Sequence, residues 1–320
     1  MQLFYFKTMI KKYPLNIFTF TGILFSVLVC SAFKPPKKDK ETTQLPVLDK
    51  PINSSNSLMW QISGNGLSKP SYLYGTIHVI DQENYFLGKN VKKKIKQCDE
   101  LVMELDMENI DVSALTKLSL LDSGKTIKNY MSDSDYAVLE TFMQDSIGIK
   151  KYTFEMLYSR LKPFYIEQLI YFKYLGQEKE SYEQNFKKLA ETDSKVISGL
   201  ETFEEQLLFL ESIPLETQLK SLTETIKSYS SEAKKLDELI ELYKKQDLNE
   251  LSKLIEDDED SVLNEKLLYK RNSNWIPKLQ TKIELKSCFI AVGAGHLGGE
   301  NGLINLLKKQ GYTVEPISTN

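Results

Sequence analysis

Histidine is nearly absent from this sequence, with only two among 320 residues. Histidine is the usual side chain for metal ligation and for proton transfer near neutral pH. A metal site with three histidines is therefore excluded, and any further ligands in such a site must be carboxylates. The positions of the two histidines are accordingly the first guide to function.

The sequence also lacks the marks of a nucleic-acid-binding protein. Its 41 Lys and Arg residues are balanced by 44 Asp and Glu residues, and it contains neither an arginine-rich face nor a long basic block. A surface that binds nucleic acid has a basic footprint of that kind. We therefore expect no nucleic-acid partner.

Two common catalytic signatures are missing as well. The sequence contains no Gly-x-Ser-x-Gly turn and no His-Glu-x-x-His motif. The first carries the nucleophile of many serine hydrolases, and the second is the helix-borne motif of many zinc proteases. Both enzyme classes are thereby disfavoured.

Cysteine is rare, with three residues in the whole chain. Cys30 lies in the N-terminal segment, whereas Cys98 and Cys288 each directly precede an expected strand. If those strands are neighbours, a disulfide can form in an exported protein. Two free, buried thiols are the alternative.

The N-terminal residues have the pattern of a targeting segment. Lys7, Lys11 and Lys12 precede an uncharged stretch from Ile17 to Phe33. This pattern predicts a signal peptide or an N-terminal membrane anchor over residues 1–33, which is either cleaved, lipidated or retained. Residues 34–57, rich in Pro, Lys, Thr, Asn and Ser, then form an expected flexible linker. We therefore expect an extracytoplasmic protein, secreted or tethered, whose membrane contact is limited to this segment.

Strand patterns cluster at both ends of the remaining chain, residues 58–320. They cover residues 58–63, 71–74, 100–106, 195–201, 288–292 and 312–317. Helical patterns fill the centre and define an insertion from about residue 111 to residue 285. The prediction is one domain of the α/β (α+β) class: a mixed β-sheet core built from both ends of the chain, with a large central helical insertion.

Both histidines close the same small motif after a strand. His78 ends Gly75-Thr76-Ile77-His78, and His296 ends Gly293-Ala294-Gly295-His296. Glycine lets the backbone turn tightly and approach a ligand closely. The recurrence predicts one site assembled from the two ends of the fold. Two unrelated polar residues in turns are the alternative.

Two acidic residues also stand at predicted strand ends, where side chains converge in open α/β sheets. They are Glu104 and Glu201. Thr202 and Glu205 have the spacing of a capping box, so a helix is expected directly after Glu201. A carboxylate in the apolar setting of Glu104 is costly unless it is paired or liganded. Arg271 could orient Glu104 or bind substrate; a surface arginine on a helix is the alternative.

The glycines around His296 allow a further interpretation. Gly293, Gly295 and Gly298 meet the Gly-x-Gly-x-x-Gly order, but His296 and the missing βαβ context argue against a dinucleotide site. The free N–H groups at the start of the last helix could hold a carboxylate, a phosphate or an oxyanion. An ordinary glycine-rich turn is the alternative.

Several of these motifs together resemble a known family. The matching residues are Trp60-Gln61-Ile62, Tyr74 to His78, the strand with Glu104, Gly199 to Thr202 with Gln206, Arg271-Asn272, Val292 to Leu297, Gly302-Leu303 and Gly311-Tyr312. They resemble the TraB/GumN family over about residues 58 to 317. This family is related to the TIKI metalloproteases and the pheromone-shutdown protein PrgY, and more distantly to erythromycin esterases and the haem-binding ChaN group. The resemblance implies a TIKI-like and erythromycin-esterase-like core.

By similarity to TIKI, the active-site set would be His78, Glu104 and His296, holding a divalent metal such as Mn, Co or Zn. Glu201 and Arg271 match family-typical positions, and Glu201 or another acid would accept the proton of a water. The implied function is an exported, metal-dependent hydrolase, a peptidase that acts on a peptide or protein. The alternatives are a metal-free, esterase-type hydrolase and a non-catalytic protein that sequesters a peptide or haem, so the sequence leaves open whether the protein is an enzyme.

Overall fold

The structure is a computed structural model that describes residues 56–105, 112–122, 124–175, 178–256 and 264–320. The targeting segment expected at residues 1–33 and the linker up to residue 55 lie outside the described residues. Ser57, at the end of the expected linker, is buried, and its Oγ donates a hydrogen bond to the carbonyl of Ile317. No helix among the described residues is long and apolar enough to cross a membrane.

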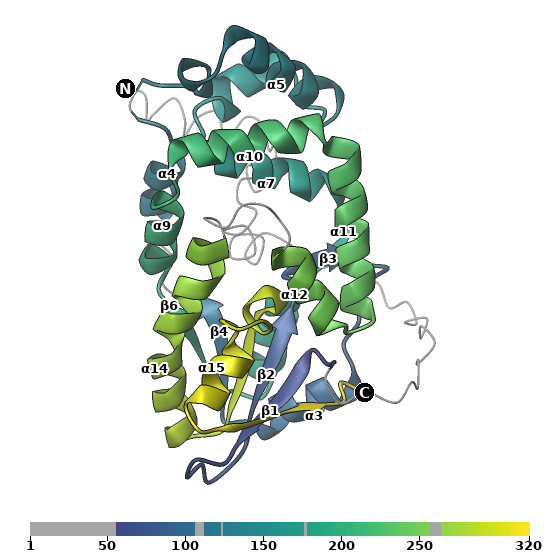
Figure 1. Ribbon diagram of the computed structural model, residues 1–320, viewed down its shortest axis with the longest axis vertical. Coiled ribbons are helices and arrows are strands. Elements are labelled where there is room, and N and C mark those ends of the chain that lie inside the picture. Colours follow the sequence, from purple (N-terminus) through teal and green to yellow (C-terminus); the bar gives the residue numbers. More distant parts are fainter. Residues whose placement is uncertain (1–55, 106–111, 123, 176–177, 257–263) are drawn as a thin grey trace.

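The core is one six-stranded sheet (Figure 1). Its strands are β1 (Met59–Ser63), β2 (Ser71–Thr76), β4 (Glu100–Leu105), β6 (Val196–Glu201), β7 (Cys288–Gly293) and β8 (Thr313–Ile317). Their order across the sheet is β6-β4-β7-β2-β1-β8. The pairs β2–β7, β4–β7 and β4–β6 are parallel, whereas β1 pairs antiparallel with both β2 and β8. The predicted mixed sheet, built from both ends of the chain, is confirmed.

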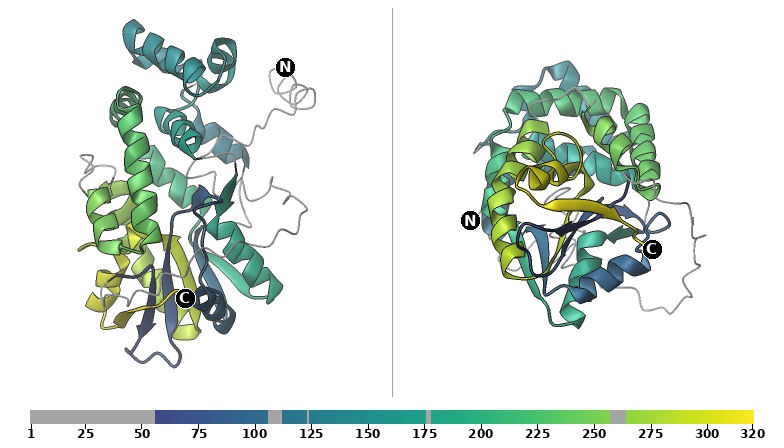
Figure 2. Two further views of the ribbon diagram at one scale, coloured as in Figure 1. Left: turned by 90° about the vertical axis from the view of Figure 1, so that its right-hand side faces the viewer. Right: turned by 60° about the horizontal axis from the view of Figure 1, so that its bottom comes forward.

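The central strands have apolar sequences because both faces of the sheet are covered. Every residue of β2, β4 and β7 is buried, which is typical of parallel strands between two layers of helices. On one side lie α14 (Lys270–Leu285) and α15 (Leu303–Lys309), and on the other lie α3 (Lys89–Gln97) and α8 (Tyr182–Thr192). Figure 2 shows the sheet between these two layers. The α/β class is therefore confirmed.

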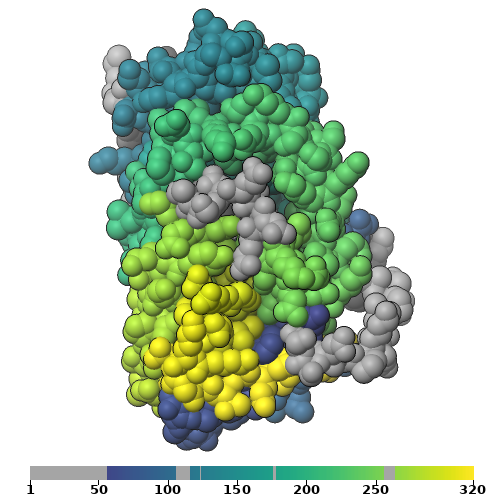
Figure 3. Space-filling model, in the orientation of Figure 1, coloured from purple at the N-terminus to yellow at the C-terminus, as the bar shows by residue number. Residues whose placement is uncertain are grey.

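The central helices form a second part beyond the carboxyl ends of the parallel strands (Figure 1). The longer ones are α4 (Val112–Ser119), α5 (Asp133–Asp145), α7 (Pro163–Tyr174), α9 (Phe203–Glu211), α10 (Leu215–Lys227), α11 (Tyr229–Lys244) and α12 (Leu248–Glu256). Shorter helical turns are η2 (Ile127–Tyr130), α6 (Lys151–Thr153), η3 (Phe154–Tyr158) and η4 (Glu265–Tyr269). Many of these helices share an apolar cluster of their own, separate from the cluster around the sheet. The two parts nevertheless meet as one continuous body in the space-filling view (Figure 3).

Two short strands were not predicted from the sequence. They are β3 (Val79–Asp81) and β5 (Lys179–Ser181), which pair antiparallel in a separate two-stranded sheet. The backbone N–H of Tyr182 then donates to the carbonyl of His78 over 3.0 Å. This pairing holds the start of α8 directly beside the first histidine motif.

Both cysteines of the described part are free and buried. The hydroxyl of Ser287 lies 3.5 Å from the sulfur of Cys98, and Cys288 follows Ser287 in the chain. Burial raises the pKa of the Cys98 thiol to about 11 and that of Cys288 to about 12. The sequence left open a disulfide or two free, buried thiols, and in the structure the two thiols are free and buried.

Candidate active site

The structure brings all five candidate site residues together at the carboxyl ends of the parallel strands. Glu104 and Glu201 lie at the ends of β4 and β6, His78 follows β2, and His296 ends the short helical turn η5 (Ala294–His296) after β7. Arg271 reaches them from the first turn of α14. This edge of a parallel sheet is the usual place for a ligand site in α/β folds.

Glu104 is the centre of the cluster. Its Oε1 lies 3.7 Å from Nε2 of His78 and 3.7 Å from Nε2 of His296. The same oxygen accepts a 2.7 Å hydrogen bond from the backbone N–H of Gly293. A Cβ added to Gly293 would lie 3.0 Å from Nε2 of His78 and 3.3 Å from Oε1 of Glu104. Glycine is therefore needed here for space, because a side chain would press on the two groups that meet.

The conformation of His78 is fixed by contacts that no sequence pattern indicated. Its backbone is left-handed, with φ of 54°, which is costly for a residue other than glycine. Its Nδ1 lies 2.9 Å from Oε1 of Glu183, and Oγ1 of Thr76 donates to the same oxygen over 2.8 Å. Glu183 is thus a site residue that the sequence analysis missed. It lies on α8 and comes near His78 only because β3 pairs with β5.

His296 is held by a different kind of partner. Its Nδ1 lies 2.7 Å from Oδ1 of Asn272, while Nδ2 of Asn272 donates to the carbonyls of His296 and Asn301. Because an amide oxygen only accepts, Nδ1 carries the proton and the unprotonated Nε2 accepts from Nη1 of Arg271 over 3.3 Å. The imidazole also packs against Trp275, with ring centroids 4.5 Å apart. In the sequence, Asn272 matches the family pattern beside Arg271, but that match implies no role for it.

Arg271 is buried, so the alternative of a surface arginine is wrong. Its Nη2 donates to Oε2 of Glu104 and to Oε1 of Glu201, each over 2.6 Å, and its Nε also contacts Glu201. Glu201 accepts a further hydrogen bond from Nε1 of Trp275 over 3.1 Å. With its oxygens committed in this way, Glu201 is better placed to hold Arg271 than to accept a proton from water.

The three central groups differ in charge at neutral pH. Burial alone would lower the pKa of His78, but its ion pair and hydrogen bond with Glu183, together with Glu104, raise it to about 9. Burial lowers the pKa of His296 to about 3 against the opposing effect of Glu104. Burial would raise the pKa of Glu104, but Arg271 and the two histidines hold it well below its usual value. His78 and Glu104 are therefore charged and His296 is neutral.

These charges predict the titration of the two imidazoles in the metal-free protein. We expect His78 to titrate near pH 9 and His296 to stay neutral down to about pH 3. Because the pKa of His78 is higher in the folded than in the unfolded chain, its protonation stabilises the fold fully below pH 6.5, and this contribution disappears as pH rises through about 9. NMR of the imidazole groups measures both values, and His78→Ala assigns the signals, since the chain has only two histidines.

Glu183→Gln is the matched variant for this titration. It keeps the shape of the side chain but removes the charge next to Nδ1, so the pKa of His78 should fall toward 6.5. Glu180→Gln on the neighbouring strand β5 should leave the pKa of His78 where it is. A wild-type pKa of 6.5 or less would contradict the ion pair between His78 and Glu183.

A cavity of about 280 Å³ lies beside the cluster. His78, Glu104, Arg271, His296 and Gly293 line its polar end. The remaining walls are mainly apolar and come from the helical part: Phe209, Leu210, Leu239, Tyr243, Leu251, Ile255, Leu267 and Leu268. One third of the His78 side chain is exposed (33%), whereas His296 is almost completely covered (3%). A ligand entering the cavity therefore meets His78 first.

Gln206 contributes an unusual polar atom to this cavity. The residue is 3% exposed, and its Oε1 is buried without a hydrogen-bond partner among the described residues. A buried acceptor without a partner costs free energy. Gln206 matches the family pattern in sequence, but no role follows from that match. The structure places the residue at the cavity wall with its Oε1 covered by neighbouring atoms.

The donor types at the centre fit a divalent metal. Two imidazole Nε2 atoms and one carboxylate oxygen are the ligands of many catalytic zinc sites, and each ring is oriented at Nδ1 by a second polar group. The spacing is wider than in a formed site, and no group of three His, Cys, Asp or Glu within the described ranges has metal-site geometry. Arg271 Nη1 also lies 3.3 Å from Nε2 of His296. Metal binding would therefore draw the side chains of His78, Glu104 and His296 together. It would also break the contact between Arg271 and His296.

The glycine-rich turn before the last helix plays no part in the cavity. Gly298, Gly299 and Gly302 are not among the residues that line it. A Cβ on Gly302 would lie only 1.9 Å from the carbonyl oxygen of Gly298. Of the two interpretations of this turn, the structure favours close backbone packing over anion binding.

Comparison with known proteins places this site in a family. The metalloprotease TIKI2 of Danio rerio is 22% identical over 362 residues, which cover 92% of this chain and 68% of the relative. The metalloprotease TIKI1 of Xenopus tropicalis is 25% identical over 337 residues, with 83% and 63% covered, and that of Homo sapiens is 24% identical over 325 residues, with 81% and 62% covered. The chain thus spans about two thirds of the length of these relatives. No solved structure matches it significantly.

The family model for TraB, PrgY and gumN proteins matches residues 58–316. This range contains the whole cluster, including Glu183 and Asn272, which hold the two imidazoles. The predicted resemblance is therefore confirmed, and the chain belongs to the TraB/PrgY/gumN family.

Proposed function

We propose that this protein is a hydrolase that cleaves peptide bonds. Its active site would be formed by His78, Glu104 and His296, whose side chains would bind a divalent metal. The observation that carries the proposal is their convergence: both Nε2 atoms lie 3.7 Å from one oxygen of Glu104. The names of the TIKI relatives as metalloproteases support the same reaction class.

The roles of the protein groups follow from their contacts. Glu183 and Asn272 fix the two imidazoles with Nε2 toward Glu104. Arg271 places a positive charge on the cavity wall, where negative charge develops on a carbonyl oxygen during hydrolysis. When bound, a divalent metal supplies polarisation of that carbonyl and a lower pKa for its water.

The cavity supports a peptide as the substrate class. Its apolar walls suit an apolar side chain, and the polar groups of the cluster at its other end suit a peptide backbone. Apolar walls with a few oriented polar groups are typical of ligand sites. An extended peptide can satisfy both parts at once.

Metal content and turnover together test the proposal. We expect near-stoichiometric Mn, Co or Zn in protein purified without chelator, measured by elemental mass spectrometry, and loss of this metal in both His78→Ala and His296→Ala. Hydrolysis of a mixed peptide pool should fall in both variants, while Lys92→Ala, an exposed position on α3, should change neither property. Full retention of metal and peptidase activity in either histidine variant would overturn the proposal.

A non-catalytic binding protein is the second candidate, because one contact favours it. Arg271 donates to Glu104 and lies 3.3 Å from Nε2 of His296, so it occupies one side of the position for a metal. Such a protein would remove a peptide, or haem, stoichiometrically rather than catalytically. Hydrolysis that survives complete chelation would instead indicate the metal-free, esterase-type reaction.

We also propose that the protein acts outside the cytoplasm, on the basis of the charge and hydropathy pattern of residues 1–33. Digestion with an added protease tests this location, in cells whose outer envelope is opened while the cytoplasmic membrane stays intact. Protection of the protein until the cytoplasmic membrane is lysed would contradict it.

A further inference from the structure

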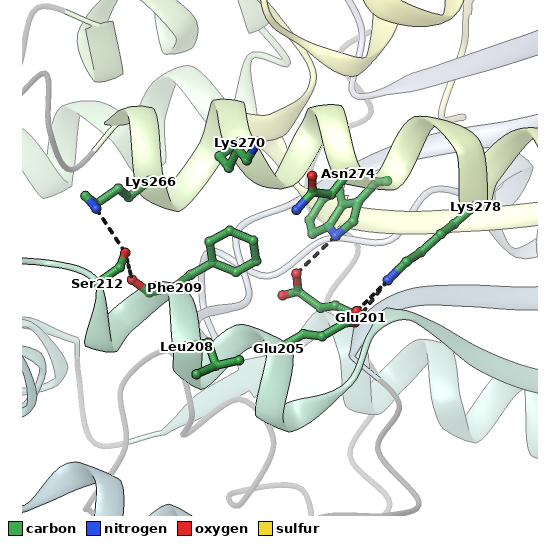
Figure 4. Close-up of a pocket in the computed structure, with 10 residues that line it drawn as sticks. Glu201, Glu205, Leu208, Phe209, Ser212, Lys266, Lys270, Asn274 and Lys278 are labelled. Atoms are coloured by element: carbon green, nitrogen blue, oxygen red, sulfur yellow. Dashed lines mark hydrogen bonds and ion pairs between the residues drawn. The ribbon is translucent and has the colours of Figure 1, made fainter.

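A second hollow lies next to the cavity and shares Phe209 with it. It has a volume of about 330 Å³ and runs between α9 and the segment formed by η4 and α14 (Figure 4). Phe209 lines both this groove and the cavity. The groove and the cavity are therefore neighbours with Phe209 as a common wall.

One wall of the groove is a row of polar residues at helical spacing. Lys266, Lys270, Asn274 and Lys278 follow one another every four residues, so they lie along one face of the η4–α14 segment. Figure 4 shows Lys266 reaching toward Ser212 and Lys278 reaching toward Glu205 on the opposite helix. Three lysines thus border the groove, along a row that spans about three helical turns.

The positive charge of this row is only partly neutralised. Lys278 pairs with Glu205 over 3.0 Å, and Glu201 at the inner end already pairs with Arg271. Lys266 donates only to the neutral hydroxyl of Ser212, and neither Lys266 nor Lys270 forms an ion pair with any acidic side chain in the described part of the chain. Among the described residues, the groove therefore has two lysines without an ion-pair partner.

The rest of the groove is apolar. Leu208 is 66% exposed, an unusual exposure for a large apolar side chain, and it lines the groove together with Phe209 and Trp275. An occupant that fits these surfaces combines an apolar or aromatic group with a negative charge. A carboxylate beside an apolar side chain has this composition, and both are common in peptides.

We infer that this groove is a substrate subsite that binds a carboxylate of the peptide through Lys266 and Lys270. The inference rests on the proposed peptidase function for its substrate, but the groove can be tested without turnover. The carboxylate is either the free C-terminus of the peptide or an acidic side chain, and these two sources are separated below.

Binding of small probes tests the groove itself. Phenylacetate carries an aromatic ring and a carboxylate, whereas phenylacetamide has the same shape without the charge. By ligand-observed NMR we expect wild-type protein to bind the acid about fivefold more tightly than the amide, a ratio that added salt should reduce. The double variant Lys266→Ala/Lys270→Ala should lose this preference, and Lys92→Ala/Lys93→Ala on the distant α3 should keep it. Equal binding of acid and amide by the wild type would overturn the subsite.

Peptide turnover then identifies the source of the carboxylate. Two kinds of substrate pair are compared. In one pair the C-terminus is either free or amidated, and in the other a Glu is replaced by Gln. In the pair that contains the bound carboxylate, the charged peptide should have the lower KM and an unchanged kcat. The preferred member of a pair names the source, and the double lysine variant should remove that preference. If the protein hydrolyses no peptide but still prefers phenylacetate, the proposed reaction is wrong while the carboxylate site stands. If peptides are hydrolysed with no preference in either pair, the subsite is wrong while the reaction stands.

Discussion

Replacing Arg271 with methionine is expected to lower the free energy of unfolding by about 3–5 kcal/mol, the usual cost of removing one partner from a buried ion pair. Arg271 is 6% exposed at its side chain and pairs with Glu104 and Glu201, so its loss leaves two buried carboxylates side by side. Methionine fills much of the same volume without supplying a charge. Urea unfolding with an unchanged dependence on denaturant measures the loss.

The matched control is Lys278→Met on the same helix. Lys278 pairs with Glu205 at an exposed position, 40% and 46% exposed, so this change should cost at most about 1 kcal/mol. Adding Glu201→Gln to Arg271→Met should recover part of the lost stability, because it removes one unpaired charge. Equal stabilities of the Arg271 and Lys278 variants would show that the buried ion pairs do not hold this site together.

Replacing Glu104 with glutamine is expected to abolish metal binding and to reduce peptide hydrolysis by about 100-fold to 1,000-fold, since the charge stabilisation that a metal supplies is worth several kcal/mol. Oε1 of Glu104 accepts the N–H of Gly293, and Oε2 accepts from Arg271. A glutamine amide must point its own N–H groups at one of these two donors. Elemental analysis and peptide turnover measure the two losses separately.

Glu100 offers a matched control on the same strand. It is buried like Glu104 and also ion-paired, with Lys282 and Lys286, but it stands at the opposite end of β4. Glu100→Gln should therefore cost stability while leaving metal content and turnover close to those of the wild type. If the Glu100 variant loses as much activity as the Glu104 variant, the loss comes from damage to β4 and not from removal of a site residue.

Much of the sheet could be predicted from the sequence because its strands are short apolar runs with clear boundaries. The rule that side chains converge at the carboxyl ends of parallel strands was enough to place Glu104 near Glu201. The capping box of Thr202 and Glu205 is present as predicted. The expected end of β2 at Tyr74 fell two residues short, because Gly75 and Thr76 pair with β7 in the parallel ladder. Such pairing is a tertiary contact that residue types alone do not specify.

The residues that orient the two imidazoles could not be predicted from the sequence. Glu183 is one of 44 acidic residues, and nothing in its neighbours separates it from a solvated glutamate. Its approach to His78 depends on β3 and β5, which are three residues long and lie about a hundred residues apart in the chain. The burial of Arg271 likewise depends on which face of α14 packs on the sheet. Local sequence patterns carry least information about the long-range pairing of such short segments.

The order of strands also constrains how the chain can acquire its structure. β7 lies between β2 and β4, which do not pair with each other, yet residues 288–293 are synthesised long after both. A chain growing from its N-terminus therefore has a hairpin and a separate parallel pair but no strand to join them. Closing such long-range contacts is slow and leaves apolar strand edges open in the meantime. A nascent chain without β7 should accordingly be prone to aggregation and protease-sensitive, and it should mature only when its last thirty or so residues are added.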